Sequence, residues 1–326
     1  MKAKSRNGPG HDKAMPAGSI SGWQRIRFLA EYALVRLAWL VLAKVPPRVA
    51  DVLGQGMGWL AYLLDFPHRR LAWANLQLAL GGERSEREIR NLARSSFLHL
   101  AAAFVDLCRS QRLLREPLAN IIQFEGLERA ERIRAQGRGM ILITGHLGSW
   151  ELGALASPLI GYPLQVVYRP LDNPYLDRWL VGMRCSTGNR AVPKRNALRP
   201  ILSSLQGGEI VVVMMDLNTV RGEGVFVDFF GRPACTTYAP ALLALWTGAA
   251  VLPILTLRQP DHRLKVVVGE EIAVSRSGDL QRDLVENTAR FTKVLEGYIR
   301  AYPEQWFWPH ERWKTKPKAR LLASKR

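Results

Sequence analysis

The 326-residue chain contains only three cysteines, Cys108, Cys185 and Cys235, and they lie far apart in the sequence. An odd number of scattered cysteines argues against a disulfide framework and fits a reducing compartment. The cysteines also lack the close spacing of zinc ligands. We therefore expect neither a structural metal site nor a catalytic one.

The chain also lacks an uninterrupted apolar run of about 20 residues, the length that a membrane-spanning helix requires. Glu31 and Arg36 interrupt the apolar residues from 26 to 45, and three glycines interrupt residues 49–66. Basic residues beside tryptophan and tyrosine are typical of a helix that lies at the level of the lipid headgroups. We expect residues 23–66 to be a membrane-associating helical region, although core helices of a soluble domain would show a similar pattern.

Acidic residues are scarce, with 28 Asp and Glu against 46 Lys and Arg, so the formal net charge is +18. This charge indicates an anionic partner, which could be nucleic acid, an acidic membrane surface, or an acidic substrate or carrier protein. The sequence has no zinc-finger, RNA-recognition or helix-turn-helix signature, which argues against nucleic acid. We expect a flexible basic tail at residues 1–22, one main domain at 67–313 and a second basic tail at 314–326.

Short apolar runs alternate with segments of helical periodicity along the main domain. This alternation predicts an α/β fold with a central mixed, mostly parallel sheet flanked by helices. We expect strands at residues 124–126, 140–143, 164–168, 210–215, 251–257 and 265–268, and helices beginning near Ser85, Leu127, Ser149, Pro240 and Leu280. Residues 184–199 are expected to form a basic connection and residues 225–233 an aromatic loop.

The segment MILITGHLGSWELG at residues 140–153 is the centre of the functional prediction. A buried strand leads into a turn that holds His146, and Glu151 falls in the first turn of the helix that follows. Two helical residues five apart would point about 140° away from each other. Because glycines favour a turn at His146, we expect the two side chains to meet, although a lone His and Glu in this setting often have no such role.

Polar side chains follow three of the predicted strands: His146, Arg169 and Asp216. Ligands of open sheets gather at the carboxyl ends of the strands, so these residues are expected to share one site. Each has a simpler explanation when taken alone, since Arg169 can pair with a surface acid and Asp216 can cap a turn. Their convergence favours a functional cluster.

The block GHLGSWE resembles the His-x4-acid signature of glycerolipid acyltransferases, and in its Glu form it is similar to the late acyltransferases of lipid A synthesis. Further segments that resemble this family are YRPLDNP, MMDLN, VFVDFFGRPACTT, GAAVLP and PEQWFWPHERWK, and together the resemblance covers roughly residues 25–314. The chain departs from the family at Leu217, where Gln is usual, and at Ser149, where Asn is usual.

The resemblance implies transfer of a fatty acyl group from an acyl carrier protein or coenzyme A thioester to a hydroxyl or hydroxyacyl group of a lipid A precursor. It implies no cofactor beyond this co-substrate, and it places the enzyme at the cytoplasmic face of the inner membrane. The positive charge would then attract the acidic carrier protein, the anionic glycolipid acceptor and the anionic membrane leaflet. The same chemistry would serve another lipid acceptor, and a non-catalytic membrane-surface protein is a less favoured alternative.

The resemblance implies that His146 is the general base and that Glu151 keeps the His146 ring in the required tautomer. No Ser or Cys lies at a nucleophile elbow, so we expect the acyl group to pass directly to the acceptor without an acyl-enzyme intermediate. Backbone N–H groups near Gly148, or Arg169, are expected to receive the oxyanion. The residues assigned to substrate binding are Arg169, Asn173, Asp216, Gly148, Phe229, Phe230 and Arg232. The aromatic residues, with Phe226, are expected to line the acyl slot, although core packing would explain them equally well.

Overall fold

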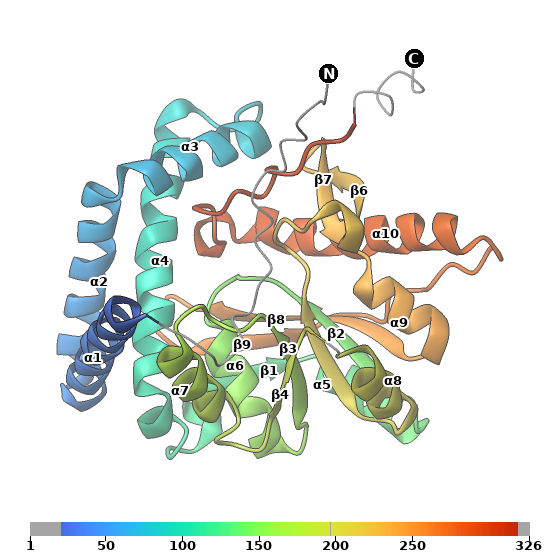
Figure 1. Cartoon of the computed structure of the whole chain (residues 1–326), viewed down its shortest axis with the longest axis horizontal. Helices are drawn as coiled ribbons and strands as arrows, with labels where there is room; N and C mark the ends of the chain where they lie inside the picture. Colours follow the sequence, from blue (N-terminus) through green and yellow to red (C-terminus); the bar gives the residue numbers. More distant parts are fainter. Residues whose placement is uncertain (1–20, 196, 319–326) are drawn as a thin grey trace.

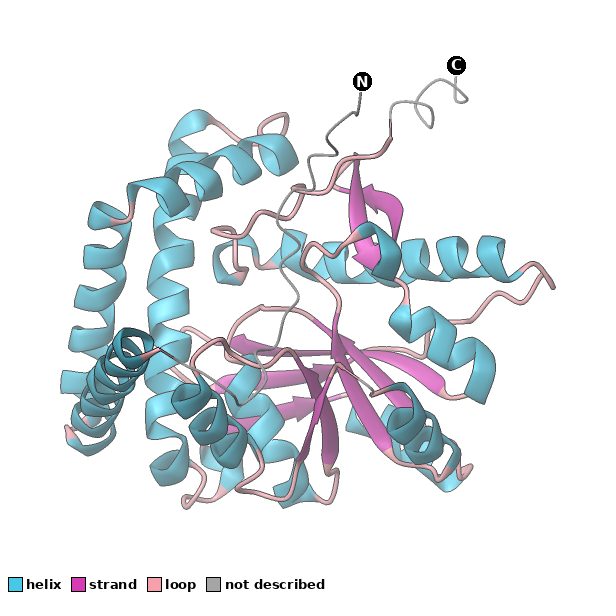
Figure 2. Cartoon of the chain, in the orientation of Figure 1, coloured by secondary structure: helices cyan, strands magenta, loops and turns pink. Residues whose placement is uncertain are grey.

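The structure is a computed structural model that describes residues 21–195 and 197–318. Its centre is a seven-stranded sheet with helices on both faces, and a separate two-stranded hairpin lies above one face (Figures 1 and 2). The strands of the sheet are β1 (Ile122–Glu125), β2 (Met140–Thr144), β3 (Leu164–Tyr168), β4 (Arg190–Pro193), β5 (Ile210–Met214), β8 (Ala250–Arg258) and β9 (Leu264–Val268). The hairpin consists of β6 (Gly224–Phe229) and β7 (Arg232–Thr237).

The order of strands in the sheet is β1-β9-β8-β2-β5-β3-β4. All neighbours run parallel except β8 and β9, which are antiparallel. The predicted mixed, mostly parallel sheet is therefore confirmed. The loop expected at residues 225–233 is wrong, because these residues form the antiparallel hairpin, and the expected connection at 184–199 contains β4.

The two faces of the sheet are buried in separate cores. In β2, Ile141 and Ile143 pack in a core with α8 (Leu198–Gln206), α9 (Ala239–Thr247) and α10 (Leu280–Ala301). The alternate residues Met140 and Leu142 pack in a second core with α5 (Leu127–Ala135) and α6 (Trp150–Ala156). Every residue of β2 is buried, as expected for a strand covered on both faces.

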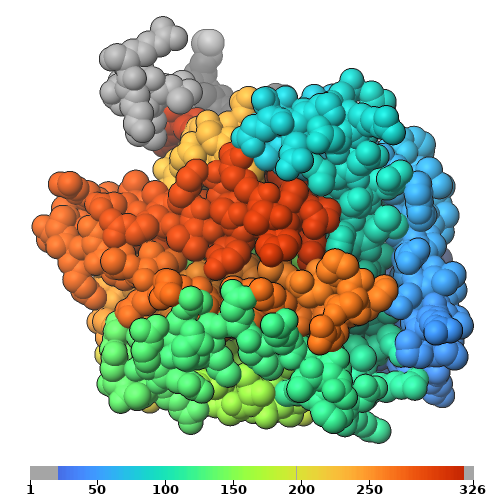
Figure 3. All heavy atoms as spheres, turned by 180° about the vertical axis from the view of Figure 1, so that it is seen from behind, coloured from blue at the N-terminus to red at the C-terminus, as the bar shows by residue number. Residues whose placement is uncertain are grey.

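Four N-terminal helices form one edge of the molecule (Figures 1 and 3): α1 (Gly22–Lys44), α2 (Pro47–Leu64), α3 (Phe66–Leu80) and α4 (Glu86–Leu113). α2 lies against α4 through the small residues Ala50, Gly54 and Gly58, which are all buried. A Cβ at Gly58 would lie 2.9 Å from the Leu98 Cα, so only glycine permits this approach of the two backbones.

The outward side of α1 and α2 is apolar. Its exposed large side chains are Trp23, Ile26, Leu29, Leu34, Leu37, Leu40, Val41, Val49, Val52, Leu53, Met57, Trp59, Leu60, Leu63 and Leu64. Among the residues that the structure describes, no helix combines the length and the apolarity required to cross a bilayer. The helices of the predicted membrane-associating region therefore expose an apolar surface without containing a membrane span.

The predicted N-terminal tail lies outside the described residues except for its last two positions. At the other end, residues 314–318 are described, and the first of them pack on the protein. Thr315 exchanges hydrogen bonds with Asn218, and Arg221 donates to the Lys316 carbonyl. The division of the chain at residues 22, 66 and 313 stays a prediction.

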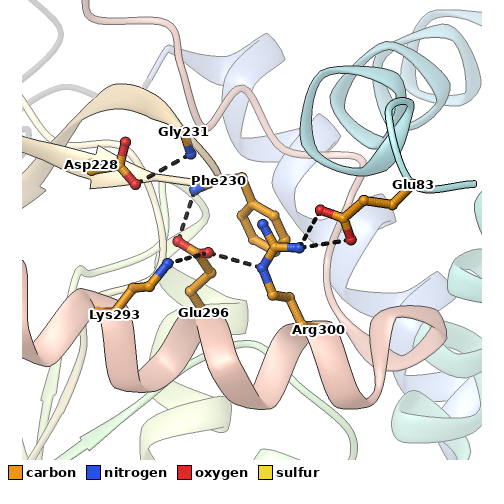
Figure 4. Close-up of polar contacts among 7 residues, drawn as sticks. All are labelled: Glu83, Asp228, Phe230, Gly231, Lys293, Glu296 and Arg300. Carbon is orange, nitrogen blue, oxygen red and sulfur yellow. Dashed lines mark hydrogen bonds and ion pairs between the residues drawn. The ribbon is translucent and has the colours of Figure 1, made fainter.

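The hairpin is fixed to α10 by a buried carboxylate (Figure 4). Glu296, whose side chain is fully buried, accepts hydrogen bonds from the backbone N–H of Phe230 (2.8 Å), from Lys293 and from Arg300. Phe230 has a φ of +54°, a conformation that is costly for a bulky residue. The hydrogen bond to Glu296 therefore stabilises the strained turn at Phe230, whose ring packs against Phe229 and Trp308.

Candidate active site

His146 follows β2 directly and lies beside Asp216, which follows the neighbouring strand β5. The His146 ring Nδ1 is 3.0 Å from Asp216 Oδ1, and the His146 backbone N–H donates to Asp216 Oδ2 at 2.7 Å. The two strands pair in register from Met140 and Ile210 to Thr144 and Met214, which brings the two residues to the same height at the sheet edge. The predicted convergence of strand ends is confirmed for this pair.

Asp216 is 2% exposed and also accepts the indole N–H of Trp306, at 2.8 Å. Burial alone would raise the pKa of Asp216, but the attraction of His146 and the hydrogen bonds from His146 and Trp306 outweigh it, so the pKa is lowered. Asp216 is therefore an ionised carboxylate, which can only accept hydrogen bonds. Its partner Nδ1 must then carry a ring proton, and in the neutral form of the ring Nε2 is the proton acceptor.

Backbone hydrogen bonds connect the turn that carries His146 to β8 on one side and to the segment around Gln305 on the other. The Gly148 N–H donates to the Gln305 carbonyl at 3.1 Å, and the Ser149 N–H donates to the Thr256 carbonyl at 2.9 Å. Gly148 has a φ of +63°, and a Cβ there would lie 2.1 Å from the Thr256 carbonyl oxygen. The N–H groups of Gly148 and Ser149 are therefore already bound within the protein, and an oxyanion role for the other N–H groups at the helix start stays a prediction.

Glu151 does not make the expected contact with His146 in the described structure. Its carboxylate forms a two-pronged ion pair with Arg184 of α7 (Pro174–Arg184), through Nε at 3.0 Å and through the terminal Nη2. Burial would lower the pKa of Arg184, but the hydrogen bond and charge of Glu151 outweigh this and raise it. The carboxylate that orients the imidazole is thus Asp216, since a helix beginning at Trp150 directs Glu151 towards α7.

A cavity of about 850 Å³ lies beside His146. Its wall includes Trp150 and Glu151 from the start of α6, together with Arg169 and Arg184. Most of the remaining wall is apolar, and β3, β5, α8 and α9 contribute to it. A cavity of this size, with a few convergent polar groups in an apolar wall, is typical of a binding site for a small molecule or a lipid chain.

Of the predicted substrate-binding residues, Arg169 lines the cavity and Asn173 does not. Arg169 lines the cavity and keeps a solvent-exposed guanidinium, 3.9 Å from Asp172. Asn173 is buried away from the cavity wall. Its side chain caps the start of α7 and donates to the Phe28 carbonyl and to Glu31, so it connects α7 to α1. The structure therefore gives Asn173 a structural role, and its assignment to substrate binding stays a prediction without support from its position.

The aromatic residues of the hairpin do not line the cavity either. Phe229 and Phe230 are 1% and 5% exposed and pack edge-on against each other. Phe229 is also edge-on to Trp306, and Phe230 is tilted against Trp308. Arg232 is exposed at the turn of the hairpin and is also outside the cavity wall. Phe229 and Phe230 pack inside the core, whereas Thr237 at the end of β7 is a hairpin residue that lines the cavity, so the structure does not support an acyl slot at the aromatic residues.

Arg184 and Trp306 are functional candidates that the sequence did not single out. Trp306 lies within the segment PEQWFWPHERWK, which contributed to the family resemblance but did not indicate a role for any of its aromatic residues. Arg184 was one of several basic residues in an expected connection, and nothing in its neighbours distinguished it. Both roles depend on contacts over 33 and 90 residues of sequence, which local patterns cannot show.

A model of a known family matches residues 23–315 of the chain and is described as bacterial lipid A biosynthesis acyltransferase. The chain belongs to this family. This acyltransferase is 29% identical to the lipid A biosynthesis lauroyltransferase of Escherichia coli K12 over 296 residues, which cover 89% of the chain and 93% of that relative. It is 27% identical to the palmitoleoyltransferase of the same organism over 281 residues, or 86% and 89% of the two chains.

A shorter match connects this acyltransferase with a protein that acts on another lipid. The phosphatidylinositol mannoside acyltransferase of Mycobacterium tuberculosis H37Rv is 32% identical to it over 132 residues, 39% of this chain and 42% of that relative. The family and the acyltransferase activity, predicted from the segment around His146, are thus confirmed.

Proposed function

We propose that this acyltransferase moves a fatty acyl chain from a carrier-protein or coenzyme A thioester to a hydroxyl of a lipid A precursor, with His146 as the general base. The observation that supports this most strongly is the His146–Asp216 pair at the wall of a large, mostly apolar cavity. The pair provides a proton acceptor, and the cavity provides space for a chain. Family membership supports lipid A as the pathway of the acceptor.

In the proposed reaction, Nε2 of His146 takes the proton of the acceptor hydroxyl while its oxygen attacks the thioester carbonyl. The Asp216 carboxylate favours the imidazolium that forms and keeps the ring in the required tautomer. The C–S bond then breaks, and the imidazolium returns its proton to the departing thiolate. The products are the acyl ester and the free thiol of the carrier.

The oxyanion requires a hydrogen-bond donor, and Arg169 is one of the candidates predicted from the sequence. It lines the same cavity as His146, and its exposed guanidinium lies 3.9 Å from Asp172. A donor of this kind contributes roughly 10²–10³ in rate. Glu151, through Arg184, is proposed to fix the wall of the cavity next to the reacting groups.

We further propose that α1 and α2 hold the enzyme on the cytoplasmic face of the inner membrane. The support is the exposed apolar side of these helices, together with the net charge of +18. An interfacial helix combined with basic residues supplies the two contributions that stable membrane attachment requires. The same charge suits an acidic acyl carrier protein as the donor.

Lipid mass spectrometry tests the proposal after expression in a Gram-negative host that lacks its own late acyltransferases. A mass gain of one acyl chain on lipid A, absent in the His146→Ala variant, is the expected result. A gain on another lipid alone would favour the second candidate, a different glycolipid acceptor, which the match to the mannoside acyltransferase supports. No mass gain on any lipid would contradict the proposal.

A further inference from the structure

The cavity beside His146 extends along both faces of the sheet. Leu164 and Val212 line it and belong to the core on the side of α5 and α6. Val167 and Val213 come from the same two strands, also line the cavity, and belong to the core on the side of α8 and α9. Neighbouring residues of a strand point to opposite faces, so the cavity wraps around the carboxyl edge of the sheet and has two arms.

The arm on the side of α6, here called the α6 arm, is apolar along its length. It is lined by Ala154, Leu164, Val166, Val212 and Ile254. Leu164 lies four residues before Tyr168, the last residue of β3, so at about 3.3 Å per residue the arm reaches about 13 Å below the sheet edge. Glu151 and Arg184 neutralise each other in the same wall.

The arm on the side of α8 and α9, here called the α9 arm, carries charge. Lys194, Arg195 and Glu223 line it together with Tyr238 and Ala239, and the Lys194 ammonium lies 3.6 Å from the Glu223 carboxylate. Charged side chains in this wall suit a phosphate-bearing or hydroxylated molecule better than a bare alkyl chain. The chemistry of the two arms therefore differs in the way that the two substrates of an acyl transfer differ.

We propose that the α6 arm holds the acyl chain that is transferred, that the α9 arm holds the phosphorylated acceptor, and that the side chains at positions 154 and 164 set the length of chain that the α6 arm accepts. This assignment rests on the proposed function and specifies how the two substrates approach His146. The thioester carbonyl then lies at the sheet edge, where the arms meet, and the acceptor hydroxyl reaches it from the opposite face.

The side chain at position 154 affects the space in the α6 arm because α6 packs closely on the sheet and is tethered there through its backbone. A Cβ at the adjacent Gly153 would lie 2.0 Å from Thr256 Oγ1, which shows how closely the helix is pressed on β8. The Ala154 carbonyl also accepts a hydrogen bond of 2.7 Å from the Asn189 side chain. A larger side chain at position 154 must therefore occupy space in the α6 arm.

The test compares Ala154→Leu with Ala239→Leu, the same substitution in the other arm. Binding of a graded series of straight-chain fatty acids is measured by displacement of a fluorescent fatty acid, and transfer is measured with acyl carrier proteins loaded with the same series. Ala154→Leu should shift both preferences to shorter chains, with affinity falling about fourfold for each methylene group that no longer fits. Ala239→Leu should leave the chain-length series unchanged and raise KM for the acceptor.

Leu164→Ala provides the opposite change, because it lengthens the α6 arm and should extend the preference to longer chains even if Ala154→Leu fails to fold. An unchanged series in folded Ala154→Leu or Leu164→Ala, or a shifted series in Ala239→Leu, would overturn the assignment of the arms. Fatty-acid binding does not depend on the acceptor. A shifted binding series without any transfer to lipid A would therefore contradict the proposed function while supporting the α6 arm.

Discussion

Trp306 donates its indole N–H to the same oxygen of Asp216 that accepts the backbone N–H of His146. The other Asp216 oxygen faces the His146 ring. Trp306 is fully buried and packs edge-on against Trp308, so it holds the carboxylate from a rigid position. The C-terminal segment thereby fixes the orientation of a carboxylate that follows β5 and of an imidazole that follows β2.

Trp306→Phe should lower kcat about tenfold while changing KM little, because one hydrogen bond to a charged group, worth about 1.5 kcal/mol, is lost from the group that orients the base. Steady-state kinetics with a saturating donor would measure this. The matched control is Trp308→Phe, whose indole donates to the Pro303 carbonyl and not to Asp216. A control that loses as much kcat as Trp306→Phe would show that the effect comes from core packing.

Glu151→Gln and Arg184→Lys should have similar effects on activity, and the double variant should be no worse than either one. The reason is that the two side chains form one two-pronged pair, which either substitution breaks. A double-mutant cycle on kcat/KM measures the coupling. Additive losses would show that Glu151 acts on the reaction independently of Arg184.

Glu296→Gln should lower the free energy of unfolding by about 2–3 kcal/mol at neutral pH, since a buried carboxylate that accepts three hydrogen bonds loses its charge. The pKa of Glu296 is lowered: burial raises it, but the Phe230 N–H, Lys293 and Arg300 outweigh burial. A lowered pKa stabilises the folded state above the unfolded value of about 4.3, and this contribution is lost as the pH falls further.

The difference between wild type and Glu296→Gln should therefore be complete at pH 7 and shrink in acid, as measured by urea unfolding at several pH values. Glu286→Gln is the control on the same helix, because Glu286 forms a half-exposed pair with Arg290. It should change stability by less than about 0.5 kcal/mol. A pH-independent difference for Glu296→Gln would argue against an ionised Glu296.

The double variant Leu60→Asp, Leu64→Asp should bind anionic vesicles more weakly than wild type, because both side chains are exposed on α2, at 57% and 67%. Vesicle flotation measures the bound fraction. The control is Leu159→Asp, Leu280→Asp, which places the same charges on exposed leucines outside α1 and α2. Equal binding by both double variants would contradict a membrane-facing role for α2.

The sequence predicted the strands that carry the site because each is a short apolar run followed by a polar residue, as at His146 and Asp216. It did not predict which carboxylate contacts His146. Glu151 is five residues away and Asp216 is 70 away, and a sequence pattern favours the near one. The choice depends on strand order, since β5 lies next to β2 only in the folded sheet.

The hairpin was missed for a different reason. Residues 225–229 alternate between buried and more exposed positions, which is a strand pattern, but their aromatic content matched an acyl slot equally well. Hydrophobicity shows that a side chain avoids water and does not show whether it contacts protein or ligand. Phe229 and Phe230 contact protein, whereas the cavity wall is built mainly from aliphatic residues that were assigned to strands and helices.

The most direct test is the single-turnover rate of acyl transfer in Asp216→Asn, His146→Ala and the double variant, with folding checked by thermal unfolding. If Asp216 orients and stabilises His146 as the base, Asp216→Asn should slow transfer by a factor on the order of 10³–10⁴, and the double variant should be no slower than His146→Ala. Transfer by folded Asp216→Asn within tenfold of the wild-type rate would contradict the account.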